Sequence, residues 1–166
     1  MPIIIAFPIL ASALILQTVI ASSLPLLSGY ADLILLILVA WALQERVRSA
    51  WIWTVIAGLM VGFVSALPTL VPVIGYVLVT AIARLVHRRV WQTPILAMFV
   101  VTFLGSLVSQ GLVMAVLVVQ GTPLPLADSV NLVILPGTLL NLLLALPVYA
   151  VVNDLAQWVY PEEVEA

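Results

Sequence analysis

Long apolar runs with almost no charge constrain this chain more than any other feature. The sequence has 166 residues, of which 65% are hydrophobic and only 7% are charged. A soluble domain carries about 25% charged residues, because most of its surface faces water. The five Lys+Arg and seven Asp+Glu residues cannot cover such a surface. The composition therefore predicts a protein whose solvent is the lipid bilayer.

The apolar runs are numerous enough to cross a membrane several times. A helix needs about 20 apolar residues to cross the roughly 30 Å hydrocarbon layer. Six such helices with short loops use nearly the whole chain, so residues 1–166 form a single transmembrane domain. We expect an all-α integral membrane bundle of six transmembrane helices, with spans at about 3–20, 31–44, 50–67, 72–88, 94–119 and 129–152.

The placement of arginine predicts the orientation. All five basic residues are arginines, and they stand in two groups, Arg46/Arg48 and Arg84/Arg88/Arg89. Two predicted spans separate the groups, so both lie on one side of the membrane. Positively charged loops remain in the cytoplasm. We therefore expect a multi-pass protein with both termini cytoplasmic.

The fourth span leaves two alternatives open, because it is short and contains Arg84. The arginine stem can stay in hydrocarbon while its guanidinium reaches water. In the alternative, residues 68–75 enter the membrane as irregular backbone, which is tolerated only where it packs against protein.

Few residues could support catalysis, metal binding or nucleic-acid binding. Cysteine is absent, which excludes disulfides and thiolate chemistry. The net charge of −2 and the lack of a polybasic segment argue against nucleic acid as a partner. His87 has no second ligand nearby and is interpreted as a solvated histidine at the membrane edge. Asp32 and Asp128 are interpreted as helix caps. We expect no enzyme, no metal site, no cofactor and no tight small-molecule binding, since no polar cluster is evident.

Small residues spaced four apart predict close contacts between helices. Gly58 and Gly62 form a GxxxG pattern, and Gly105 and Gly111 each begin a similar pair in the fifth span. Such spacing lets two helix backbones approach closely in lipid. We expect these residues in internal packing or, alternatively, in contact with a partner helix.

An amide in the last span is a further candidate for helix packing or partner contact. Asn141 follows Pro136-Gly137 and precedes Pro147. Prolines free backbone carbonyls within a helix, and a buried amide can bond to them. We therefore expect Asn141 to be a buried structural amide.

Several short segments combine residues in a way that is typical of one family. They are Leu16-Gln17, Ala31-Asp32-Leu33, Val39-Ala40-Trp41-Ala42-Leu43, Leu135-Pro136-Gly137-Thr138-Leu139-Leu140-Asn141 and Leu146-Pro147-Val148-Tyr149. With these segments the chain resembles the rod shape-determining protein MreD family over nearly its full length. The stretch that begins at Leu135 is the most specific part.

The resemblance implies a non-enzymatic scaffold subunit of the bacterial cell-elongation complex, which synthesises peptidoglycan and sets rod shape at the inner (plasma) membrane. It implies an MreC-like bitopic membrane protein as the direct partner, bound through the transmembrane region. RodA, a class B penicillin-binding protein and MreB filaments are the implied indirect partners. The family also resembles, in fold, the substrate-binding subunits of energy-coupling-factor vitamin transporters. Such a transporter subunit is therefore the alternative function.

Overall fold

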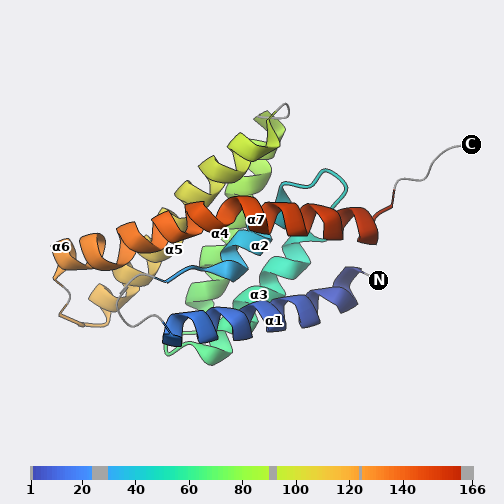
Figure 1. The fold of residues 1–166 in the computed structure, drawn as a ribbon. Coiled ribbons are helices and arrows are strands. Elements are labelled where there is room, and N and C mark those ends of the chain that lie inside the picture. Colours follow the sequence, from blue (N-terminus) through green and yellow to red (C-terminus); the bar gives the residue numbers. More distant parts are fainter. Residues whose placement is uncertain (1, 24–29, 90–92, 124, 162–166) are drawn as a thin grey trace, which may run out of the picture.

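The described part of the chain is helical throughout, apart from its connections (Figure 1). The computed structural model describes residues 2–23, 30–89, 93–123 and 125–161. The helices are α1 (Pro2–Ser23), α2 (Leu33–Ala42), α3 (Ala50–Val64), α4 (Leu70–Arg89), α5 (Pro94–Val119), α6 (Leu126–Ser129), the π-helical segment η1 (Val130–Ile134) and α7 (Leu135–Val159). For these residues the prediction of an all-α chain is confirmed.

Four helical stretches are long and apolar enough to cross a membrane. They are Ile3–Ile20, Leu70–Arg88, Pro94–Val119 and Ala127–Val159. The helices α2 and α3 are apolar too, but they have only 10 and 15 residues. At 1.5 Å per residue, α2 extends about 15 Å, roughly half of the hydrocarbon layer. The structure therefore supports a membrane protein, in which two of the six predicted spans are helices shorter than the bilayer.

The short helix α2 lies at the centre of the bundle. It contacts the four long helices, α1, α4, α5 and α7, and also the shorter α3. All of its residues except Ile37 are buried. A helix that is apolar on every side is stable only when it is surrounded. Because α2 is too short to cross the hydrocarbon layer, its apolar side chains are buried mainly against the neighbouring helices.

Two glycines bring α3 and α4 into close contact. A Cβ atom on Gly58 would lie 2.6 Å from the Cα of Val73, and one on Gly62 would lie 2.9 Å from the Cα of Thr69. These distances leave no room for a side chain, so the two backbones can approach only because both positions are glycine. The chain turns at residues 65–69 and is helical again from Leu70.

Polar and aromatic contacts also join α3 to its neighbours. The hydroxyl oxygen of Thr54 on α3 lies 2.6 Å from that of Thr80 on α4, and both residues are fully buried. The hydroxyl of Thr54 donates to the carbonyl of Ala50, so Thr80 must be the donor between the two threonines. The rings of Trp41 on α2 and Trp53 are stacked, with centroids 4.2 Å apart.

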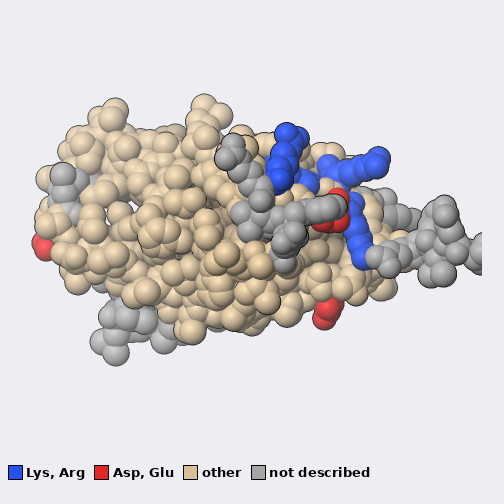
Figure 2. Space-filling model, turned by 90° about the horizontal axis from the view of Figure 1, so that it is seen from above, with Lys and Arg blue, Asp and Glu red and all other residues tan. Residues whose placement is uncertain are grey.

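The described arginines gather toward one end of the bundle (Figure 2). Between α2 and α3, residues 43–49 contain Arg46 and Arg48, and the guanidinium of Arg84 donates to the carbonyl of Val47. The helix α1 begins, and α7 ends, at this same end, while α6 lies at the other (Figure 1). On the face that Figure 2 shows, the described surface between the ends is almost entirely uncharged.

Candidate functional site

Three side chains from different parts of the chain bind the first N–H groups of α2. The carboxylate of Asp32 accepts from the N–H of Leu35 at 2.9 Å. The amide oxygen of Gln17 on α1 accepts from the N–H of Ile34 at 3.4 Å. The first N–H groups of a helix have no partner within it. Asp32 is therefore the N-cap of α2, as the sequence predicts.

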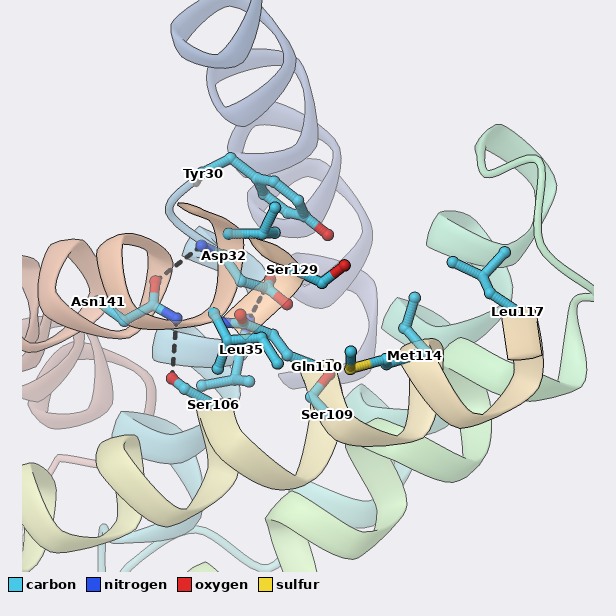
Figure 3. Close-up of a pocket in the computed structure, with 13 residues that line it drawn as sticks. Tyr30, Asp32, Leu35, Ser106, Ser109, Gln110, Met114, Leu117, Ser129 and Asn141 are labelled. Atoms are coloured by element: carbon cyan, nitrogen blue, oxygen red, sulfur yellow. Dashed lines mark hydrogen bonds between the residues drawn. The ribbon is translucent and has the colours of Figure 1, made fainter. Parts of the chain in front are cut away.

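The third side chain is Asn141 on α7, which links three helices. Its oxygen accepts from the backbone N–H of Asp32 at 2.8 Å, and its nitrogen donates to the hydroxyl of Ser106 on α5, also at 2.8 Å (Figure 3). Asn141 is completely buried. The sequence predicted a buried amide bonded to freed carbonyls. The observed partners are instead an N–H group and a hydroxyl of other helices.

A π-helical turn shapes the chain just before Asn141. Proline has no N–H group, and its ring collides with the carbonyl four residues earlier in a regular helix. Pro136 lies two residues after the end of η1, and the residue between them, Leu135, donates its N–H to the carbonyl of Val130, five residues back. The wider turn accommodates the proline, and such turns occur often at functional sites.

Tyr76 holds the carboxylate of Asp32 from a fourth helix. The hydroxyl of this buried residue on α4 lies 3.1 Å from both carboxylate oxygens. The donors that the structure gives to this carboxylate are thus a hydroxyl and the N–H groups of Leu35 and Ile34, all uncharged. The start of α2 is therefore fixed by α1, α4 and α7 together.

A cavity of about 200 Å³ opens beside this polar cluster. It lies between the C-terminal half of α5 and the segment from Ser129 to Asn141 (Figure 3). These segments adjoin α6, which lies at the end of the bundle away from the arginines (Figures 1 and 2). Its polar lining residues are Tyr30, Asp32, Ser106, Ser109, Gln110, Ser129 and Asn141. The amide oxygen of Gln110 is buried and has no hydrogen-bond partner within the described residues.

Gly137 lets α7 approach this site closely. A Cβ atom there would lie 3.2 Å from the carbonyl oxygen of Tyr30 and 3.2 Å from the amide nitrogen of Gln110. Any larger residue would push α7 away from both groups. Gly137 thus keeps α7 close to Gln110, a residue that lines the cavity.

The expectation that no polar cluster faces a concave site is wrong. No local sequence pattern predicts this cluster, because its members lie on or next to α1, α2, α5 and α7 and come together only in the folded chain. The available signal was the presence of Gln17, Asp32 and Asn141 in or beside apolar segments, where polar groups need partners.

The predicted packing residues occupy different environments. Asn141 lines the cavity, whereas Gly58 and Gly62 lie in the contact between α3 and α4. A Cβ on Gly105 would lie 3.0 Å from Val79 of α4. Gly111 is exposed, and no described side chain comes within 4 Å of a Cβ placed there.

A second cavity, of about 220 Å³, lies at the arginine end. His87 lines this cavity together with Arg46 and Gln44. The histidine side chain is half-buried rather than fully solvated. Asp128, predicted to be a cap, lies exposed within the short α6. Among the described residues, no three His, Cys, Asp or Glu side chains are grouped so that they could hold a metal ion.

Comparison of the chain with protein-family models, with curated proteins and with solved structures finds no match.

Proposed function

We propose that the chain is a non-enzymatic membrane subunit of the bacterial cell-elongation machinery, similar to MreD, and that it binds an MreC-like bitopic protein. In this proposal six segments cross or enter the inner membrane, and the arginine end and both termini face the cytoplasm. RodA, a class B penicillin-binding protein and MreB are then reached through the MreC-like partner.

The observation that carries the proposal is the convergence of the MreD-like segments. Gln17, Asp32 and Asn141 belong to three different segments of the resemblance, and each bonds an N–H group at the start of α2. Three of the segments on which the resemblance rests thus come together at the start of α2. This convergence is the structural observation that supports the resemblance.

The exposed surface favours a partner that binds through apolar contact. Phe63, Val119 and Leu143 are 81%, 87% and 73% exposed, on α3, α5 and α7. At the arginine-free end, residues 65–70 and 120–129 contain one charged side chain, Asp128. Helices in lipid associate by close packing and a few hydrogen bonds, which salt does not screen. A transmembrane helix of the partner, and the outer segment that continues it, fits such a surface.

Co-purification tests the proposal. The chain is co-expressed with a tagged MreC-like protein and purified through that tag in low salt and in high salt. A tagged bitopic protein of unrelated sequence is the control. We expect co-purification with the MreC-like protein at both salt concentrations and none with the control. Failure at both concentrations would remove the scaffold assignment, and loss in high salt alone would remove only the apolar mode of contact.

The cavity favours a second candidate, the substrate-binding subunit of an energy-coupling-factor vitamin transporter. Such a subunit needs a polar cavity near the outer face, and the cavity of about 200 Å³ lies in the half of the bundle without arginine. Thermal-shift screening against water-soluble vitamins tests this candidate. A rise in melting temperature at micromolar concentration of one vitamin would support it, and no response to any of them would remove it.

A further inference from the structure

The cavity beside Asp32 has features that helix packing alone does not require. We propose that it is a binding site for a primary ammonium group carried on a small apolar body. The inference rests on the cavity and not on the partner contact proposed above. Failed co-purification and failed amine binding are therefore separate results.

The first feature is the carboxyl group of Asp32, which has no positively charged partner in the described structure. The carboxylate of Asp32 accepts from the backbone N–H groups of Leu35 and Ile34 and from the hydroxyl of Tyr76, and all three donors are uncharged. A charge inside a membrane protein is unfavourable unless it is paired, and such residues usually mark a functional site. A carboxylate offers about four acceptor positions. Asp32 therefore retains capacity to bind a cation.

Capping does not explain the charge. Asparagine caps a helix about as well as aspartate, because only a side-chain oxygen is needed. The cap thus accounts for the hydrogen bond to Leu35 but not for an ionised group. Figure 3 shows the carboxylate of Asp32 directed toward the cavity and the side chain of Ser129.

The second feature is an excess of hydrogen-bond acceptors. The buried amide oxygen of Gln110 has no partner among the described residues, and such a group costs free energy until it receives a donor. Ser109, Ser129 and Tyr30 also line the cavity, and the hydroxyl of Ser129 already donates to the carbonyl of Pro125, which leaves its oxygen as an acceptor. A primary ammonium group has three N–H donors and no acceptor. It can serve Asp32 and Gln110 at once, which a neutral or anionic group cannot do as well.

The third feature is the separation of polar and apolar lining. Asp32, Asn141 and Ser106 gather on one side, while Met114 and Leu117 of α5 lie on the other (Figure 3). An apolar cavity of about 150 Å³ is large enough for benzene. A cavity of about 200 Å³ therefore has room for an aromatic ring or a short alkyl chain next to the ammonium group.

Two sources carry this chemistry. One is a soluble aralkyl or alkyl amine, and the other is the ethanolamine head group of a phospholipid. Both present a primary ammonium, whereas the choline head group has no N–H donor. The experiment separates the two sources.

The full chain is placed in nanodiscs of phosphatidylglycerol, and binding of 2-phenylethylamine is measured by calorimetry, with 2-phenylethanol as the uncharged analogue. We expect saturable binding of the amine that is at least tenfold tighter than binding of the alcohol. Addition of phosphatidylethanolamine, but not phosphatidylcholine, weakens amine binding if the lipid is the natural ligand. If neither lipid competes, the ligand is a soluble amine.

Matched variants assign the site. Asp32→Asn keeps a capping oxygen and the shape but loses one acceptor for Tyr76, so we expect folded protein with a slightly lower melting temperature and at least tenfold weaker binding of the amine. Asp128→Asn removes an exposed carboxylate outside the cavity lining and should bind as the parent does. Gln110→Leu, which removes an acceptor at similar size, gives a second measurement and should weaken amine binding about threefold or more.

The proposal is overturned if the parent shows no saturable amine binding, or if amine and alcohol bind equally. It is also overturned if Asp32→Asn binds the amine as tightly as the parent. Should Asp32→Asn not fold, unchanged binding by Gln110→Leu overturns it in the same way.

Discussion

The side-chain oxygen of Asn141 accepts the backbone N–H of Asp32 at 2.8 Å, across 109 residues of sequence. This bond joins α7 to the start of α2, which is too short to span the bilayer by itself. The same amide donates to Ser106 on α5. One side chain therefore holds together the end of the bundle at which the cavity lies.

Replacement of Asn141 should destabilise the fold. In Asn141→Leu, the N–H of Asp32 and the hydroxyl of Ser106 both lose their partner in a buried place. The expected loss is about 1–3 kcal/mol in the free energy of unfolding. Thermal melting in detergent measures it. Asn131→Leu is the control, because Asn131 is exposed on η1 and should melt as the parent does. Equal melting of both variants would contradict the structural role of Asn141.

Glycine substitutions should separate packed positions from open ones. Leucine at Gly58 or Gly62 places side-chain atoms where the backbone of α4 lies, and forces α3 and α4 apart. We expect a large loss of folded protein for both variants. Gly111→Leu, on the exposed face of α5, is the control and should purify normally. Size-exclusion yield and melting temperature are the measurements, and normal behaviour of Gly58→Leu and Gly62→Leu would show that this helix contact is wrong.

The threonine pair between α3 and α4 should show energetic coupling. In Thr80→Val, the donor to Thr54 is lost while the shape is nearly kept. Interhelical hydrogen bonds in membrane proteins contribute about 0.6 kcal/mol on average and up to about 1.7 kcal/mol. A double-mutant cycle with Thr54→Val should give a coupling energy in this range. A value of zero would mean that the two hydroxyls do not interact in the membrane.

Cysteine labelling tests the orientation in a chain that has no cysteine of its own. Thr122 and Glu45 are both exposed and lie at opposite ends of the bundle. An impermeant maleimide should label Thr122→Cys in intact cells, and should label Glu45→Cys only after lysis, because the arginine end is expected in the cytoplasm. Labelling of Glu45→Cys in intact cells would reverse the proposed topology.

The local properties of the chain could be predicted because they depend on neighbouring residues. Membrane residence follows from apolar runs, and helix is the structure that satisfies its own backbone groups in lipid. Asp32 was predicted to cap because its oxygen needs to reach only the N–H of Leu35, three residues away. The close approach at Gly58 and Gly62 follows the same logic, since their spacing puts both on one helix face.

The same logic does not distinguish Gly105 from Gly111. Both begin a small-residue pair on α5, yet one packs on Val79 and the other faces open space. With 3.6 residues per turn, positions six apart point about 120° away from each other. Which direction meets α4 depends on where α4 lies, and no local pattern contains that information.

The site itself was decided by the tertiary structure. Gln17, Asp32 and Asn141 are polar residues in or beside apolar segments, and the sequence alone marks them as residues that need partners. Their hydrogen-bond partners come from other parts of the chain. Gln17 accepts from the N–H of Ile34, and the carboxylate of Asp32 accepts from the hydroxyl of Tyr76. Asn141 accepts from the N–H of Asp32 and donates to Ser106. Composition determined that this chain is helical and belongs in a membrane, because lipid acts on each segment separately. Packing around the short α2 decided where the polar groups meet, because that depends on all five helices that surround α2.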